Sequence, residues 1–310
     1  KKSILIYIIE PELWKQKDMS LRQWQFTLDS LKDLQQQLIN NNLYLNILCG
    51  DALEIFKFLK KKYNFDSVIS EQETGIKWTF ERDKKLKSFF LQNDIHWTEC
   101  AYPGVRRGHH DRNQWAKFFR KDILRYPNLP VIKQSINLGL KNYDLPKNFY
   151  DTTPCPNRQK GGSREAEKLL STFLNSRGEN YQYEMSSPIS AEKSCSRLST
   201  HLTYGTISHR SVFQEATQKK EKIQLTNKNF AKSINSFLSR LHWRSHFIQK
   251  LEDQPSIEHE SFIPVYDQIR EKDFRKLDAC YKGKTGVHNI DACMIYLRNH
   301  RWINFRMREM

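Results

Sequence analysis

Residues 4–48 read ILIYIIEPELWKQKDMSLRQWQFTLDSLKDLQQQLINNNLYLNIL, and this stretch decides the class of the fold. It opens with an apolar run at 4–9 and closes with another at 43–48. Ser20 and Gln23 have the spacing of a helix capping box. Two strands joined by a helix need a crossover connection, which makes them parallel. A strand, a helix and a second strand are therefore predicted, because apolar residues recur between the runs at helical spacing, namely Leu21, Trp24, Leu28, Leu31 and Leu38.

The same alternation continues over the next fifty residues. Asp51 and Glu54 have capping-box spacing, and a helix is expected to follow them. A short run at 67–70, a helix from about Trp78 and a run at 95–100 come next. The pattern predicts a Rossmann-like α/β domain with a parallel sheet covered by helices on both faces. A Gly-x-Gly-x-x-Gly sequence does not occur, so a dinucleotide site of that type is not predicted.

Composition and spacing then divide the chain. Five prolines and a pair of glycines lie within 126–162, which is typical of a connector. Beyond the connector the apolar spacing is helical, with a helix ending at Gly178 and a longer one at about 230–251. We expect an α/β domain at 1–125 and an all-α domain at 163–310.

The charge and cysteine content limit the classes of partner. The 51 Lys and Arg residues against 35 Asp and Glu give a net charge of +16, which attracts polyanions such as nucleic acid. The alternative is that a Lys-rich and Asn-rich composition reflects an AT-biased genome and a solvated surface. The six cysteines form no Cys-x-x-Cys pair, and no apolar run reaches the length of a membrane span. We expect a cytoplasmic monomer that contacts no membrane.

Adjacent histidines form one candidate metal site. His109 and His110 precede Asp111, but neighbouring side chains point apart and no third ligand is suitably spaced. We expect no metal. No Ser-His-Asp order or Cys-His pair stands out either, so the sequence identifies no catalytic residue.

Hydroxyl groups mark a candidate phosphate site. Ser196 and Ser199 lie on either side of Arg197 and Leu198 at a predicted helix start. Unpaired backbone N–H groups at such a start suit an anionic phosphate. The alternative is an ordinary serine N-cap, which is far commoner, so the motif alone is a weak signal.

One arginine falls on an apolar helix face. Arg244 shares that face with Phe237, Leu241 and Ile248. A buried guanidinium needs a carboxylate, a phosphate or a carbonyl group as its partner. The alternative is an arginine at the edge of the face whose charged end reaches water.

Next to Arg244, an aromatic residue, Trp243, lies among cationic side chains. Trp243 and His242 turn toward a face that also carries Arg240. Stacking and phosphate contacts of this kind hold single-stranded or flipped bases. Packing of Trp243 in the core is the other interpretation.

Ordered motifs along nearly the whole chain resemble the photolyase/cryptochrome family (deoxyribodipyrimidine photolyase-like). The resemblance implies an α/β antenna domain followed by an incomplete all-α FAD-binding domain, in a fragment truncated at both ends. The motifs are ILIYIIEPELW (4–14), EQETGIKWTFERD (71–83), GVRRGHHDRNQWAKFF (104–119), GGSREAEKLLSTFL (161–174), CSRLSTHLTYGTISHRSVF (195–213), FLSRLHWRSHF (237–247), GKTGVHNIDACM (283–294) and RWINFRMREM (301–310).

The resemblance also implies a function. It implies a blue-light flavoprotein that holds FAD, with a folate or a deazaflavin as a possible second, antenna chromophore. Light-driven electron transfer would repair a damaged pyrimidine pair flipped out of DNA, the carbon–carbon lyase reaction of a DNA photolyase. The alternative is a cryptochrome-like photoreceptor without repair activity.

Individual positions are carried over by the same resemblance. FAD-binding residues are implied at Tyr183, Ser196, Arg197, Leu198, Ser199, Arg244, Trp302 and Arg308, with Asp291 in the segment before the last two. Contacts to DNA or the lesion are implied at Arg240, His242 and Trp243, and an antenna contact at Glu73.

The chain departs from the family pattern at several positions. Arg240 stands where pyrimidine-dimer photolyases have a glutamate, and a cation cannot accept the hydrogen bonds that this glutamate accepts. Cys195 replaces a threonine, and Phe237 replaces a tryptophan. The histidines of (6-4) photolyases are replaced by Asn304, Phe305 and Glu309. Arg240 and the missing histidines favour the photoreceptor.

Overall fold

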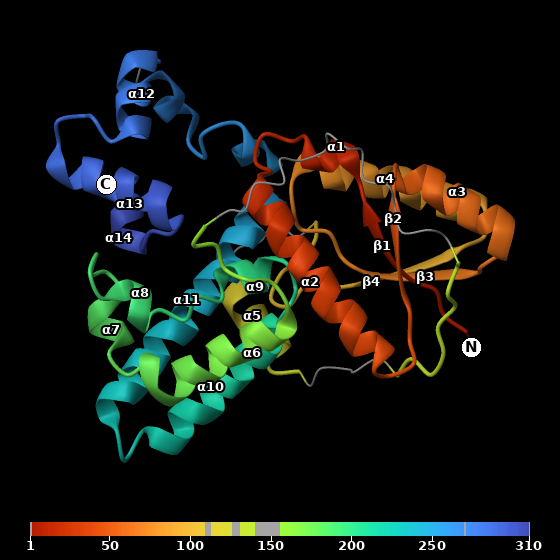
Figure 1. Ribbon diagram of the computed structural model, residues 1–310, viewed down its shortest axis with the longest axis horizontal. Helices are drawn as coiled ribbons and strands as arrows, with labels where there is room; N and C mark the ends of the chain where they lie inside the picture. Colours follow the sequence, from red (N-terminus) through yellow and green to blue (C-terminus); the bar gives the residue numbers. More distant parts are fainter. Residues whose placement is uncertain (1, 109–112, 126–130, 140–155, 270, 310) are drawn as a thin grey trace. The chain divides into compact units, whose positions relative to one another are not determined.

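The computed structural model describes residues 2–108, 113–125, 131–139, 156–269 and 271–309 (Figure 1). The chain forms two compact units that interleave in sequence. The first unit is Lys1–Thr153 with Ser245–Glu258, and the second is Pro154–Arg244 with His259–Met310. The histidine pair at 109–110 and the aspartate at 111 lie outside the described residues.

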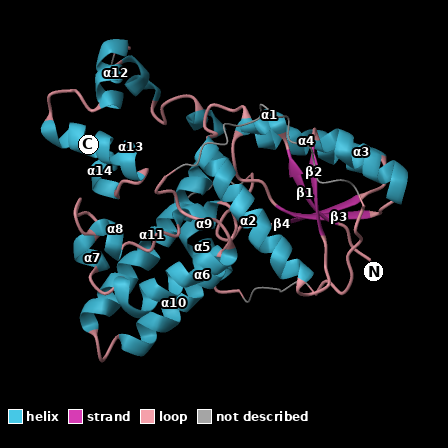
Figure 2. Ribbon diagram, in the orientation of Figure 1, coloured by secondary structure: helices cyan, strands magenta, loops and turns pink. Residues whose placement is uncertain are grey.

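The four strands all belong to the first unit and pair in parallel, as predicted (Figure 2). Strand β1 (Leu5–Ile9) pairs with β2 (Leu45–Cys49), and β3 (Ser67–Glu71) pairs with β4 (His96–Cys100). The strands form two two-stranded sheets rather than the single sheet expected. No backbone hydrogen bonds join β1 to β3. Among the described residues, each strand pair therefore has edges without a partner strand.

Capping side chains begin two helices of this unit, as the sequence predicts. Ser20 Oγ accepts a hydrogen bond from the backbone N–H of Gln23, and Asp51 Oδ1 accepts one from that of Glu54 at 3.1 Å. The helices are α1 (Pro11–Trp14), α2 (Leu21–Ile39), α3 (Ala52–Tyr63), α4 (Lys77–Gln92) and α5 (Trp115–Ile123).

Side-chain alternation along β1 builds two separate cores. Tyr7 and Ile9 pack in a cluster with residues of α1 and α2, whereas Ile6 and Ile8 pack with those of α3 and α4. The second strand pair is covered on one face only, since Ile69 on β3 is 76% exposed. The expectation that helices cover both faces is therefore wrong for β3 and β4.

The second unit is helical in all its described elements, as predicted. The long helix α11 (Lys228–Asp253) begins here and ends among the residues of the first unit, and η2 (Pro255–Glu258) belongs to the first unit. The core gathers Phe173, Leu198, Val212, Ile234 and Phe237. The other elements are α6 (Ser163–Thr172), the π-helix η1 (Phe173–Arg177), α7 (Tyr181–Glu184), α8 (Ala191–Ser194), α9 (Ser199–Thr203), α10 (His209–Ile223), η3 (Pro264–Gln268), α12 (Phe274–Lys282), α13 (His288–His300) and α14 (Phe305–Glu309).

No helix in the described ranges is long and apolar enough to cross a membrane.

Candidate functional site

Residues 195–199, here named the serine loop, connect α8 to α9 in the second unit. Leu198 anchors the loop in the core, with 1% of its surface exposed. This leucine, not a serine, occupies the N-cap position of α9, so the interpretation of the motif as an ordinary serine cap is wrong. Ser196 Oγ instead accepts a hydrogen bond from the N–H of Leu198 at 3.4 Å. Arg197 has a left-handed backbone, with φ of 63°.

Two backbone donors of the serine loop are unused. Within the described part of the chain, the N–H groups of Ser196 and Arg197 donate no hydrogen bond. The Ser196 and Ser199 side chains are half-buried and exposed, respectively. The loop therefore offers N–H and O–H donors to a ligand that carries acceptor oxygens.

The Arg197 side chain joins the serine loop to the last part of the chain. Its guanidinium lies over the ring of Trp302 at 4.5 Å, and its nearest carboxylate oxygen is Oε1 of Glu192 at 3.7 Å. Burial lowers the pKa of Arg197, with the Glu192 carboxylate opposing the shift. The buried Nη1 atom has no hydrogen-bond acceptor among the described residues. The structure thus brings two predicted FAD residues, Arg197 and Trp302, into contact.

Three residues that the sequence did not single out complete this cluster. The other carboxylate oxygen of Glu192 accepts a hydrogen bond from the hydroxyl of Tyr296. Burial and this bond raise the pKa of Tyr296 to about 12. The Tyr296 ring stacks on His300, with centroids 4.2 Å apart. Nothing in their spacing could have identified them, since Glu192 and Tyr296 are 104 residues apart.

Arg244 finds a backbone partner. Its Nη2 donates to the carbonyl oxygen of Leu202 at 3.1 Å, and the side chain is half-buried. Leu241 and Phe237 on the same helix are buried, each 3% exposed. Arg244 therefore packs beside α9, the helix that follows the serine loop.

The predicted DNA contacts lie on the same half of α11. Trp243 is 47% exposed, so its interpretation as a core residue is wrong, and His242 is half-buried. The Arg240 guanidinium lies over the Phe305 ring at 5.2 Å. Burial raises the pKa of Tyr181 to about 12, and the Arg240 charge and hydrogen bond oppose that shift.

Other predicted residues are not brought to the serine loop. Tyr183 is 65% exposed and Arg308 is exposed, and neither side chain bonds to residues 195–199 in the described structure. Asp291 accepts hydrogen bonds from the N–H groups of Thr285 and Gly286, and the bond from Thr285 is the main cause of its lowered pKa. Asp291 thus fixes the turn before α13.

Asn304, which the resemblance aligns with a histidine, is a buried structural residue. Its side-chain nitrogen donates to the carbonyl of Ser187 at 2.8 Å, and its oxygen accepts from the N–H of Met307 at 2.7 Å. These bonds attach the start of α14 to the segment between α7 and α8.

Glu73 belongs to an ion-pair network in the first unit. It accepts a hydrogen bond from the N–H of Gly75 and pairs with Arg82 at 3.3 Å. Arg82 also pairs with Glu10 at 2.7 Å and Asp83 at 2.9 Å. Burial is the main cause of the raised pKa of Glu10 and Asp83, and Arg82 opposes it.

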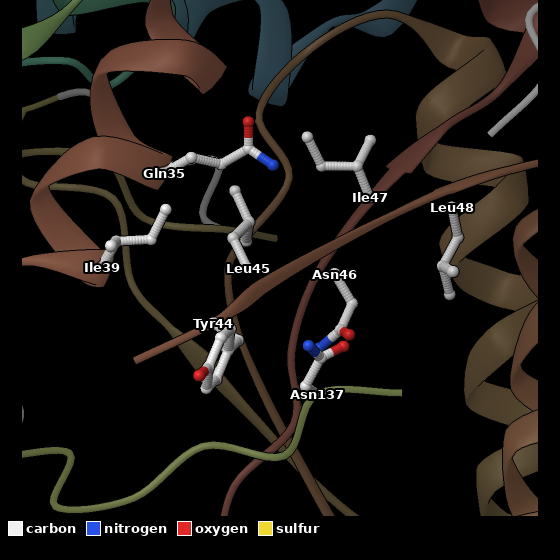
Figure 3. Close-up of a pocket in the computed structure, with 8 residues that line it drawn as sticks. All are labelled: Gln35, Ile39, Tyr44, Leu45, Asn46, Ile47, Leu48 and Asn137. Atoms are coloured by element: carbon white, nitrogen blue, oxygen red, sulfur yellow. The ribbon is translucent and has the colours of Figure 1, made fainter. Parts of the chain in front are cut away.

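A small cavity in the first unit collects none of the predicted site residues. It has a volume of about 180 Å³ and lies along β2, where the side chains of Asn46 and Asn137 lie close together (Figure 3). The Asn46 amide donates to the carbonyls of Leu5 and Ile136 and accepts from the N–H of Leu138. Asn46 therefore acts as a structural bracket between chain segments.

The serine loop fits a phosphate-bearing cofactor better than a metal. A buried arginine with an open donor, two unused N–H groups and two hydroxyls all offer hydrogen bonds to anionic oxygens. Among the residues that the structure describes, no group of three or more His, Cys, Asp or Glu side chains could hold a metal ion.

Family models match both parts of the sequence. Residues 1–103 match DNA photolyase, and residues 237–310 match the FAD binding domain of DNA photolyase. A deoxyribodipyrimidine photo-lyase from Halobacterium salinarum is 30% identical over 171 residues, which are 51% of this chain and 35% of that protein. Cryptochrome-2 from Gallus gallus is 24% identical over 98% of this chain and 56% of its own length. The chain thus spans about a third to a half of these relatives.

The fold has a close counterpart among solved structures. A bacterial class III photolyase from Agrobacterium tumefaciens superposes with a TM-score of 0.80 at 19% identity, over 99% of this chain and 65% of that one. The DNA photolyase model covers the strands of the α/β unit, and the FAD binding domain model covers the last part of the chain, which includes α12 to α14. The chain belongs to the photolyase/cryptochrome family.

Proposed function

We propose that this chain forms part of a blue-light flavoprotein and that the serine loop holds the phosphate groups of FAD. When bound, FAD supplies light-driven one-electron chemistry. The observation that carries this proposal is the buried Arg197 guanidinium, which has an open donor beside two unused backbone N–H groups. Arg244, through the carbonyl of Leu202, and Trp302, through Arg197, border the same loop.

We further propose that the substrate is DNA containing a damaged pyrimidine pair, flipped out of the helix and repaired by light-driven electron transfer. The net charge of +16 favours contact with a polyanion. Trp243 presents an exposed ring on which a base can stack, with His242 and Arg240 on the same helix. The reaction class would be that of a DNA photolyase, a carbon–carbon lyase. Glu73 is the proposed contact of an antenna chromophore, and the proposed domains keep the limits 1–125 and 163–310.

The surroundings of Arg240 support a second candidate, a photoreceptor without repair activity. Its guanidinium stacks on Phe305 and hydrogen-bonds Tyr181. A guanidinium donates hydrogen bonds but accepts none, so Arg240 cannot accept a bond from a lesion base. An FAD-binding protein that leaves lesions intact would fit this substitution.

The absorption spectrum of the purified protein tests FAD binding. We expect flavin bands from the wild-type protein and from a control, Arg298→Met, whose arginine has one exposed carbonyl partner. Arg197→Met should lower the flavin content at least tenfold, because it removes the buried cation. Wild-type protein that binds no added FAD would contradict the proposal.

Illumination separates repair from sensing. The flavin-loaded protein is mixed with an oligonucleotide that contains a pyrimidine dimer and is exposed to blue light. Restored pyrimidines, absent in the dark control, are expected for repair. Flavin binding with no restored pyrimidines would favour the photoreceptor.

A further inference from the structure

Arg177 packs against the serine loop, and four of the five hydrogen bonds from its guanidinium go to backbone carbonyls. Its Nη1 donates to the carbonyls of Cys195 at 2.6 Å and Lys193 at 3.2 Å. Its Nη2 donates to the carbonyls of Leu169 at 2.9 Å and Ser196 at 3.4 Å. The Nε group donates to the hydroxyl of Thr172, the last residue of α6, at 3.0 Å. A guanidinium has five N–H donors, so these five bonds employ them all.

A π-helical turn places this arginine. Arg177 is the last residue of η1, and the N–H of Gly178 bonds to the carbonyl of Phe173 at 3.0 Å, five residues back. Such single π turns are rare and frequently occur at functional sites. The Arg177 guanidinium also lies 6.0 Å from the Phe173 ring.

The bonds to the loop carbonyls set the direction of the loop N–H groups. In a trans peptide the carbonyl and the following N–H point in opposite directions. The carbonyls of Cys195 and Ser196 point at Arg177, so the N–H groups of Ser196 and Arg197 point away from it. These are the two donors that have no acceptor in the described structure.

The arrangement also accumulates positive charge. The five oxygen partners of Arg177 are all neutral, and Arg197 is a second cation beside the loop. Burial is the main cause of the lowered pKa of Arg177, and the charge of Arg197 adds to it. Glu192, 3.7 Å from Arg197, is the single carboxylate paired with these two cations in the described residues. The local field therefore favours an anion.

We propose that Arg177 is a positioning residue, which fixes the serine loop so that the N–H groups of Ser196 and Arg197 face the diphosphate of the cofactor. This inference rests on the proposed FAD function. Arg177 need not touch the ligand itself, because its donors are already occupied by the backbone.

The test compares Arg177→Met and Arg177→Lys with wild type. Arg177→Met removes all five bonds, and Arg177→Lys keeps the charge but cannot span the separated carbonyls. The control is Arg275→Met, at an exposed arginine of α12. FAD affinity is measured by titration well below the unfolding temperature, with inorganic pyrophosphate as competitor. Trypsin cleavage after Lys193 and Arg197 is measured without ligand by mass spectrometry.

We expect Arg177→Met to weaken FAD binding at least tenfold and to speed cleavage at both sites, while the control changes neither. Arg177→Lys should lie between wild type and Arg177→Met. If wild type binds FAD and Arg177→Met binds it equally well, the positioning role is overturned and the proposed function stands. If wild type binds no FAD, the proposed function fails and the positioning role fails with it, and faster cleavage in Arg177→Met would then show only that Arg177 holds the loop backbone.

Discussion

His201 is a fully buried histidine two residues beyond the serine loop. Its exposed fraction is 0%, and Nδ1 lies 2.8 Å from the hydroxyl of Thr206. Burial lowers the pKa of His201 to about 4. The unfolded chain protonates at the ordinary value of about 6.5, so the unfolded state binds more protons between these values. The stability that a neutral His201 contributes is therefore lost as the pH falls from about 6.5 towards 4.

We expect the free energy of unfolding to fall by about 2 kcal/mol from this residue between about pH 7 and pH 5. Urea denaturation at both pH values checks it. His201→Gln should flatten the pH dependence by this amount, whereas His96→Gln, at an exposed position, should leave it unchanged. An equally steep dependence in His201→Gln would contradict the assignment.

At the residue scale the sequence predicted part of the cluster around the serine loop, but not the contacts that hold it together. The serine loop and Trp302 are found from motifs, because each lies in a conspicuous local pattern. Arg177 bonds to backbone up to 19 residues away, and Glu192 accepts a bond from Tyr296, 104 residues away. Both look like ordinary surface charges in the sequence. Contacts of this kind depend on tertiary packing, which local spacing does not encode.

The helix pair formed by α6 and η1 shows why one glycine is required. A Cβ added to Gly178 would lie 2.7 Å from the carbonyl oxygen of Phe173 and 2.8 Å from a carbon of its ring. Real Cβ atoms do not approach backbone so closely, so the π turn must shift to admit one. The sequence predicted that Gly178 ends a helix, but the π geometry before it carries no local signal.

Gly178→Ala should lower the free energy of unfolding by about 1 to 3 kcal/mol, the usual cost of overpacking. Because the π turn places Arg177, FAD affinity should fall as well. Urea denaturation and FAD titration measure the two effects. Asn175→Ala, at an exposed position in the same turn, is the control and should change neither by much. Wild-type values in Gly178→Ala would show that the turn tolerates a side chain.

Strand pairing marks the limit of prediction at the element scale. Apolar runs and helix caps gave the strands, their parallel direction and the starts of α2 and α3. The division into two sheets is not visible in the runs, because a run does not show which other strand it pairs with. Which strand edges pair depends on contacts with segments that are far away in the sequence.

Across the whole molecule, the net charge of +16 gives a prediction for DNA binding. Neutralised phosphates release counterions, so affinity falls steeply with salt. About four phosphate contacts would weaken binding roughly 100-fold between about 50 and 200 mM salt. Fluorescence anisotropy with a labelled duplex measures it, and a duplex with an uncharged backbone serves as control. Affinity that does not respond to salt would contradict a phosphate-directed contact.

Helix α11 also determines when the α/β unit can be completed during synthesis. The unit includes Ser245–Glu258, and Gln249 from this segment bonds to the backbone of Arg106 while Glu252 pairs with Arg107. A ribosome adds about 5 to 20 residues per second, so the roughly 90 residues between Thr153 and Ser245 delay these contacts by about 5 to 20 s. The nascent N-terminal unit therefore stays unfinished until most of the helical unit has been translated, and the order of folding differs from the order of the sequence.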